Sequence, residues 1–202
     1  MKPIAIVSAL SDRKELVKQT LDSIKNNTVV NYKLFTKDGM KDGEMKTVNK
    51  LIKEIDFDWT YLVRTDDDMY HSLYWLTEML SALDRYDDVW LIGGARYPTH
   101  KILEERDEIY IMDICPGNHW LIRRDIFEML GGEFYEDFIP SEAEDKRYCM
   151  AIQELGGKVA CLKDPTKVVH CGIKNVKGRG RSPYVEGYTQ ALVDVAGVKT
   201  NR

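Results

Sequence analysis

The 202-residue chain has no long hydrophobic run, and no stretch approaches the length of a membrane-spanning helix. Its first residues lead directly into a short apolar run, residues 4–7, which is too short for the core of a signal peptide and is followed by no cleavage site. We therefore expect a protein without a transmembrane segment that works in the cytoplasm of a bacterium or of a virus-infected host cell.

Closely paired cysteines and a strong excess of one charge are also absent. The four cysteines lack the short spacings of structural zinc sites and lie in apolar surroundings, so we expect buried free thiols. They are Cys115, Cys149, Cys161 and Cys171. A formal net charge of −4 argues against a general nucleic-acid coat protein. Because 44% of the residues are apolar, the composition favours a folded globular protein over a disordered one.

The sequence does contain an alternation of strand and helix patterns. Short apolar runs predict strands, and apolar residues three or four positions apart predict helices. The expected strands cover 3–10, 32–36, 59–65, 89–94, 108–114, 158–162 and 167–171. The expected helices cover 12–26, with Ser11 as its cap, 48–55, 73–83, 122–130 and 144–155. This alternation predicts an α/β layered domain, in which ligands bind beyond the carboxyl ends of the strands.

Three consecutive aspartates, Asp66, Asp67 and Asp68, follow the expected strand 59–65 at its carboxyl end. Carboxylates at the end of a buried strand are costly unless they bind a cation or a substrate. If the segment is extended, Asp66 and Asp68 point to the same side, so one can hold a metal and the other the ribose or sugar of a nucleotide. Oxygen ligands suit Mg²⁺ or Mn²⁺. The alternative is a solvated turn that caps the following helix.

Two further sites gain meaning beside this motif. Glu144 and Asp145 open an expected helix, where acidic side chains favour the positive end of the helix dipole. Asp145 shares a helical stripe with Cys149 and Ile152, which turns its carboxylate toward the interior and suits a general base. His170 ends the last expected strand, and imidazole is a good ligand for Mn²⁺. Each residue alone has an ordinary structural explanation, but together they predict one cleft with a metal, a phosphorylated ligand and a base.

The chain ends in a basic segment. We expect residues 1–173 to form the catalytic domain and residues 174–202 to be a basic, glycine-containing loop or tail of the same domain. The first part of this tail carries four cations and no acid, namely Lys174, Lys177, Arg179 and Arg181. It is either a solvated tail or a loop that closes over a diphosphate with its glycines as hinges, and the sequence leaves both open.

In order and spacing, these motifs resemble the GT-A glycosyltransferases, most closely the inverting enzymes of family 2. The matching segments are 4–10 (the nucleotide-binding first strand), 66–68 (the D-x-D metal motif), 117–124 with 127–132 (the acceptor side), 144–145 (the E-D helix) and 170 (the metal-binding histidine). Each motif alone is weak, but their common order over most of the chain makes the resemblance specific. Two positions depart from the family pattern: Lys37 stands where an acidic residue usually reads the base, and Arg147 replaces an acidic residue after the E-D pair.

The resemblance implies a three-layer α/β/α sandwich with a mostly parallel mixed sheet. It further implies metal-dependent, inverting transfer of a hexose from a nucleotide-diphosphate sugar, with a UDP-sugar favoured, to an acceptor hydroxyl. Mn²⁺ or Mg²⁺ would be bound by Asp68 and His170, and Asp145 would be the catalytic base. The implied donor-binding residues are Ser8, Ala9, Leu10, Asp38, Asp66, Asp67, Lys174 and Arg179. The implied acceptor-side residues are Gly117, Asn118, Trp120 and Glu144.

The acceptor is left open by the sequence: a glycan, a lipid-linked precursor, a protein and the hydroxymethylated nucleobases of viral DNA all fit. A rival reading is a metal-dependent nucleotidyltransferase. That class usually grips a triphosphate with a glycine-rich, basic segment after the first strand, and residues 8–12 are not of this kind. A non-catalytic nucleotide-sugar-binding module is a second rival, which the complete acidic set disfavours.

Overall fold

The computed structural model of the protein describes residues 2–94, 97–136 and 144–171. The main sheet contains β1 (Ile4–Leu10), β2 (Lys33–Asp38), β3 (Tyr61–Thr65), β5 (Val89–Gly93), β6 (Ile102–Glu105), β7 (Ile109–Met112), β8 (His119–Arg123) and β9 (Lys158–Leu162). Their spatial order is β2-β1-β3-β8-β5-β9-β7-β6. A separate two-stranded ribbon pairs β4 (Met69–His71) with β10 (Val168–His170) in antiparallel fashion.

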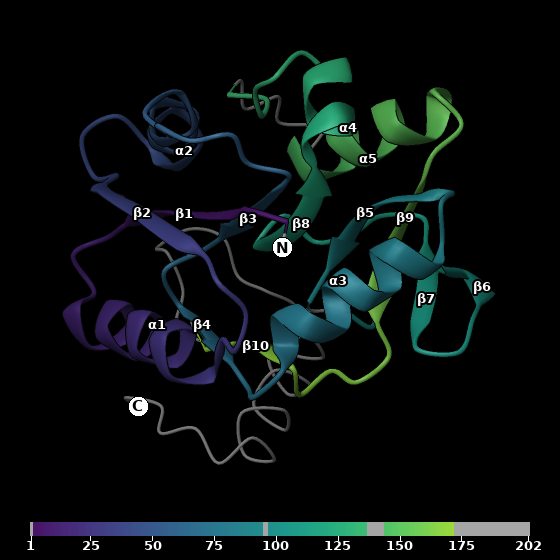
Figure 1. Cartoon of the computed structure of the whole chain (residues 1–202), viewed down its shortest axis with the longest axis horizontal. Helices are drawn as coiled ribbons and strands as arrows, with labels where there is room; N and C mark the ends of the chain where they lie inside the picture. The colour runs from purple at the N-terminus through teal and green to yellow at the C-terminus, as the bar shows by residue number, and fades with distance from the viewer. Residues whose placement is uncertain (1, 95–96, 137–143, 172–202) are drawn as a thin grey trace.

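Helices cover both faces of the main sheet (Figure 1). One face carries α1 (Lys14–Asn27) and α3 (Trp75–Arg85), with the β4–β10 ribbon on the same side. The other face carries α2 (Glu44–Lys53), α4 (Arg124–Met129) and α5 (Glu144–Glu154). This arrangement confirms the predicted α/β/α sandwich with a mixed sheet.

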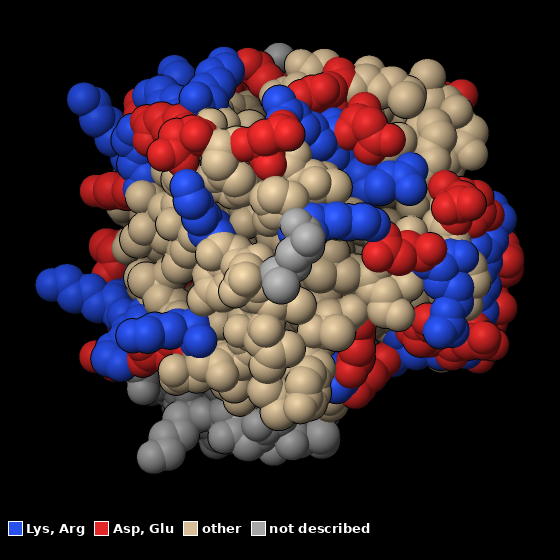
Figure 2. All heavy atoms as spheres, in the orientation of Figure 1, with Lys and Arg blue, Asp and Glu red and all other residues tan. Residues whose placement is uncertain are grey.

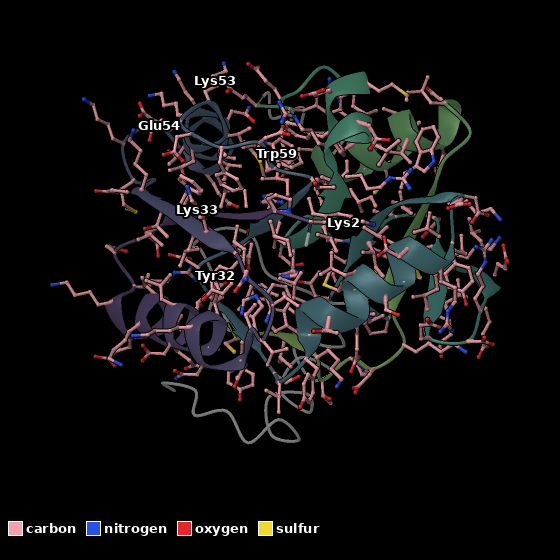
Figure 3. The ribbon with its side chains drawn as sticks, in the orientation of Figure 1. Lys2, Tyr32, Lys33, Lys53, Glu54 and Trp59 are labelled. Atoms are coloured by element: carbon pink, nitrogen blue, oxygen red, sulfur yellow. The ribbon has the colours of Figure 1, made fainter. Side chains whose placement is uncertain are left out.

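Two hydrophobic cores separate the layers because the strands are apolar on both faces. In β1, Ile4 and Ile6 face the core beneath α1 and α3, whereas Ala5 and Val7 face the core beneath α2 and α4. Strands covered on both faces read as continuous apolar runs, which is why β1 and β3 could be predicted from sequence. Trp59, labelled in Figure 3, belongs to the second core.

The sheet is mixed because β8 and β7 each pair antiparallel with their neighbours. Strand β8 runs antiparallel to both neighbours, β3 and β5, while β1 pairs in parallel with β2 and β3. The predicted helix 122–130 is therefore wrong at its start, because Ile122 and Arg123 belong to β8 and α4 begins only at Arg124. A short apolar run buried on both faces does not reveal its period, so helix and strand cannot be told apart there.

Smaller predictions can also be compared with the structure. Ser11 does not cap α1; Arg13 is at the cap position, and the Ser11 hydroxyl instead accepts hydrogen bonds from the Arg13 backbone N–H and Nε. The four cysteines are buried free thiols, as predicted. Strands β4 and β6 were not predicted. Among the described residues, no helix has both the length and the apolarity needed to cross a membrane. The tail 174–202 lies outside the described residues.

Candidate functional site

The carboxyl ends of β1, β2 and β3 meet at one edge of the sheet and enclose a cavity of about 260 Å³. Four of the predicted donor residues line it: Ala9, Leu10, Asp66 and Asp67. Two others do not. The Ser8 side chain is fully buried within β1, and the exposed Asp38 accepts a hydrogen bond from the Met40 backbone N–H at 2.8 Å.

Asp67 and Asp68 form a turn directly after Asp66, so this is not the extended segment in which Asp66 and Asp68 would share a side. Asp67 and Asp68 are buried, and Arg13 of the segment before α1 bridges them. Its Nη2 lies 2.7 Å from Asp67 Oδ1, and its Nη1 lies 2.6 Å from Asp68 Oδ2. Ser11 adds a backbone N–H to Asp67 Oδ2. Sequence reasoning missed Arg13 because its partners lie far away in the chain.

The β4–β10 ribbon brings Asp68 and His170 together. His170 lies opposite Met69 in the ribbon, and the Cys171 N–H donates to the Asp68 carbonyl at 2.7 Å. As a result, His170 Nε2 lies 3.1 Å from Asp68 Oδ1, and both side chains are nearly buried. Burial alone raises the pKa of Asp68, but the neighbouring His170 and Arg13 outweigh it and hold this pKa well below its ordinary value. The structure thus assembles the two residues predicted as metal ligands.

Tyr97 and Asn118 hold His170 from its other side. The Tyr97 hydroxyl lies 2.7 Å from His170 Nδ1, and the Asn118 side-chain amide donates to the same hydroxyl at 2.9 Å. A partner on the second ring nitrogen is what commonly fixes the orientation of a metal-binding histidine. Tyr97 was not predicted, since no local pattern marks it.

These residues suit a divalent metal that shares its coordination with a ligand. The buried Asp68 Oδ1 makes no well-aligned hydrogen bond within the part of the chain that the structure describes, although it faces His170. The same described ranges contain no group of three histidine, cysteine or acidic side chains placed to hold a metal. Mg²⁺ and similar ions are often held by one or two carboxylates together with substrate phosphates and water, and this pair provides such a partial shell.

A second charged cluster lies beside the first. The Arg64 side chain is 2% exposed, and its Nη2 pairs with Glu44 Oε1 and, at 3.1 Å, with Asp66 Oδ1. Burial and the nearby charge of Glu44 raise the pKa of Asp66 well above its ordinary range. Glu44, which the sequence did not identify, therefore lies in the same charged cluster as Asp66.

The start of β8 connects this cluster to the predicted base. The Asp66 N–H donates to the Asn118 carbonyl at 2.9 Å. The next residue back, Gly117, directs its N–H to Asp145 Oδ2 at 3.4 Å, and the Lys146 N–H donates to Asp145 Oδ1 at 2.7 Å. Asp145 is half-buried, as its helical stripe predicted. A side chain at Gly117 would lie 3.0 Å from Asp145 Cβ and 3.1 Å from Arg64 Nη1, so any larger residue there would crowd both side chains.

The remaining predicted acceptor-side residues lie in two different environments. Trp120 is a core residue, stacked on Tyr148 with ring centroids 5.2 Å apart and lying beneath Arg64. Glu144 lines a second cavity of about 350 Å³, which adjoins the first because Glu44 lines both. Their roles toward an acceptor stay predictions. The predicted phosphate contacts Lys174 and Arg179 lie outside the described residues.

Comparison with known proteins places the fold. No protein-family model and no curated protein match the chain. Solved structures do match the chain. S. aureus TarS 1–349 in complex with UDP-GlcNAc aligns at a TM-score of 0.61 and 14% identity, over 100% of this chain and 68% of that one. The mannosyltransferase PcManGT from Pyrobaculum calidifontis, with GDP-Man and Mn²⁺, aligns at 0.60 and 12% over 96% and 73%.

The fold is that of the GT-A glycosyltransferases. A mutant of Drosophila β-1,4-galactosyltransferase 7, in complex with manganese, UDP-Gal and xylobiose, also aligns with this chain. The TM-score is 0.60 and the identity 15%, over 100% of this chain and 82% of that one. In another TarS structure, the matched region spans only 58% of the TarS fragment. At identities this low, the structural alignments establish the GT-A fold and nothing finer. In this fold, the clusters around Asp68 and Asp145 lie at the carboxyl edge of β3.

Proposed function

We propose that this protein is a metal-dependent glycosyltransferase that moves a hexose from a nucleotide-diphosphate sugar to an acceptor hydroxyl with inversion. A UDP-sugar is the favoured donor. The known structures of similar fold were solved with UDP-GlcNAc, with UDP-Gal and manganese, and with GDP-Man and Mn²⁺, which supports this class of donor and cofactor.

The observation that carries the proposal is the approach of Asp68 to His170, at 3.1 Å, beside the cavity formed by the ends of β1, β2 and β3. These two side chains come from distant parts of the chain, and both are nearly buried, so a merely solubilising role does not explain them. The arrangement fits a cation that faces a diphosphate in the cavity. When bound, Mn²⁺ would neutralise charge on the leaving nucleoside diphosphate.

Donor binding and proton transfer are assigned to protein side chains. Asp66 and Asp67 line the donor cavity, where the Asp66 carboxyl group can form a hydrogen bond with the nucleotide or the sugar. Asp145, oriented by the N–H groups of Gly117 and Lys146, takes the proton of the acceptor hydroxyl. The acceptor then attacks the anomeric carbon from the face opposite the nucleotide, which gives inversion.

A thermal-shift panel tests the proposal. UDP-, GDP-, CDP- and dTDP-sugars would each be added with and without Mn²⁺, because a ligand that binds only the native state raises the melting temperature. We expect one nucleotide series to stabilise the protein only when Mn²⁺ is present, with UDP the first candidate. Slow Mn²⁺-dependent hydrolysis of the same nucleotide sugar would show catalysis. If no nucleotide sugar stabilises the protein, or if NTP and sugar phosphate yield pyrophosphate, the proposal is wrong.

A further inference from the structure

Arg13 is a cation held on the aspartate turn. Its two terminal nitrogens reach different carboxylates, at 2.7 Å for Asp67 and 2.6 Å for Asp68, and its Nε donates to the Ser11 hydroxyl at 3.0 Å. The Arg13 side chain is 41% exposed, while those of Asp67 and Asp68 are 5% and 6% exposed. An exposed arginine therefore closes over two buried acids.

The two acids need a cation in this position. Adjacent buried carboxylates repel one another, and both ionise readily only if a positive charge lies close by. Asp67 is fully engaged, since Arg13 binds Oδ1 and the Ser11 N–H binds Oδ2. In Asp68, Arg13 binds Oδ2 and His170 faces Oδ1. Arg13 thus supplies the counter-charge on the same carboxylate that is predicted to bind the metal.

A divalent ion and this guanidinium compete for Asp68. An ion bound between Asp68 and His170 would bring two positive charges close to Arg13, and like charges at such separations repel strongly where solvent screening is weak. The metal therefore binds more readily once Arg13 has left Asp68. The side chain has space to do so, because Arg13 lines the same cavity as Ala9, Gly39 and Asp66.

The chemistry of the cavity indicates where the guanidinium goes. Arginine presents a planar fork of donors that matches phosphate oxygens in two parallel hydrogen bonds. A donor diphosphate in this cavity would lie within reach of a side chain that already lines it. When Arg13 leaves the acids, it gives up its two carboxylate partners and pairs with a phosphate group, which is also negatively charged.

We propose that Arg13 is a displaceable counterion: it holds Asp67 and Asp68 while the metal is absent, yields Asp68 to the metal, and then binds the donor diphosphate. The proposal rests on the proposed function, since it needs a metal and a diphosphate at this edge. It assigns Arg13 as a donor-binding residue and as the counter-charge of Asp67 and Asp68.

The test uses direct binding rather than turnover. Arg13→Gln removes the charge, Arg13→Lys keeps it without the fork, and Arg124→Gln is the matched control. Arg124 also bridges two carboxylates, Asp58 and Glu128, but it lies at the opposite end of β3, where its N–H donates to the Thr60 carbonyl. Mn²⁺ affinity is measured without nucleotide from the electron paramagnetic resonance signal of the free ion, and UDP and GDP affinities are measured calorimetrically at saturating Mn²⁺.

We expect Arg13→Gln to bind Mn²⁺ about tenfold more tightly than the parent and the preferred nucleoside diphosphate about tenfold more weakly, a change of about 1.4 kcal/mol in each direction. Arg13→Lys should fall between the two, and Arg124→Gln should match the parent. Unchanged or weaker Mn²⁺ binding by Arg13→Gln overturns the competition, and unchanged diphosphate binding overturns the transfer to phosphate. Thermal melts of each variant establish that it is folded.

The two hypotheses fail in different ways. If the parent protein binds Mn²⁺ and a nucleoside diphosphate but the Arg13 variants behave like the control, only the role of Arg13 is wrong. If the parent and all variants bind neither ligand, the proposed function is wrong, and the role of Arg13 is overturned with it.

Discussion

At the scale of single residues, Asp145 offers the sharpest test of the chemistry. Replacing Asp145 with Asn keeps the size of the side chain and one of its two accepted hydrogen bonds but removes its ability to take a proton. We expect transfer to fall about 10²- to 10⁴-fold, the usual contribution of a general base, while Mn²⁺-dependent donor binding stays within twofold. Initial rates and calorimetry measure the two quantities. Glu154→Gln, at the exposed far end of the same helix, is the control. If Asp145→Asn keeps near-parental rates, another group takes the proton.

His119 gives a prediction about stability and pH. Its ring is fully buried, neither ring nitrogen has a hydrogen-bond partner among the described residues, and burial with the nearby Arg64 charge lowers its pKa to about 3. The folded protein keeps this ring neutral, whereas the unfolded chain binds a proton below about pH 6.5. Stability from this residue is therefore complete above pH 6.5 and is lost as the pH falls toward 3.

The expected size follows from the same linkage. Between pH 7.5 and 5.5, the parent should lose about 1.4 kcal/mol of unfolding free energy through His119, and His119→Phe should not lose this part. Urea unfolding at the two pH values measures the difference. Because the ring makes no hydrogen bond, an apolar replacement should cost little at pH 7.5. An equal pH dependence in parent and variant would show that His119 takes up the same number of protons in the folded and unfolded states, so that its pKa is not lowered on folding.

Residue types in order along the chain were enough to nominate Asp68, Asp145 and His170, which the structure brings to one edge. They were not enough to nominate Arg13, Glu44 or Tyr97. A catalytic carboxylate can be recognised in the sequence when it follows a buried strand, where an unpaired charge would be costly. A lone arginine before a helix, or a tyrosine in a loop, acquires its meaning only from partners that the fold supplies.

At the scale of elements, the β4–β10 ribbon places His170 beside Asp68, and Gly94 leaves room for the ribbon to pack. A side chain at Gly94 would lie 2.3 Å from Val168 Cγ2 and 3.0 Å from His119 Nδ1, so alanine there must push β10 away. We expect Gly94→Ala to lose about 1–3 kcal/mol of stability and to bind Mn²⁺ about tenfold more weakly, because His170 moves with β10.

Gly157→Ala is a control for this overpacking. Its added Cβ would meet the Trp90 ring at 2.3 Å, at the start of β9 and away from the ribbon. A comparable loss of stability with unchanged Mn²⁺ affinity is expected there. Denaturant melts and free-ion measurements on both variants separate general destabilisation from displacement of His170. Equal Mn²⁺ affinity in the two variants would show that the ribbon does not set the metal pair.

Elements with a clear period were predictable, and those defined by tertiary pairing were not. The apolar runs that form β1 and β9 are bounded by turn residues, so both were predicted as strands. Strand β8 is followed at once by α4 with no turn residue between them, so its apolar run merged with that of the helix. The three-residue strands β4 and β10 exist because they pair with each other, which the sequence alone does not show for β4.

At the scale of the whole molecule, charge bears on the acceptor. On the face drawn in Figure 2, basic and acidic side chains lie side by side around a neutral centre. Many of the described cations are paired; Arg106 and Lys158, for example, share Asp88 and Glu104. The cavity beside Glu144 is lined by Asp42, Glu44 and Glu136 as well. If the protein acts as proposed, we therefore expect neutral or hydroxyl-rich acceptors rather than polyanions at this cavity, where Lys46 is the only cation among the lining residues.

This leads to a prediction about nucleic acid. Proteins that bind DNA through phosphate contacts lose affinity for DNA steeply as the salt concentration rises. At low salt, excess DNA therefore sequesters such proteins. We expect excess duplex DNA at about 50 mM salt to leave the rate on a neutral saccharide acceptor unchanged. Donor hydrolysis with and without DNA provides a second measurement. Strong inhibition that salt relieves, or transfer to hydroxymethylated DNA, would instead favour a DNA acceptor and a role for the basic tail.

The ribbon also has a consequence for biosynthesis. Strands β1, β2 and β3 come from the first third of the chain and leave the ribosome early. Asp68 must wait for His170, because β10 is among the last described segments to emerge. Domains generally fold as units. If the protein acts as proposed, we therefore expect catalysis only after β10 has left the ribosome and paired with β4.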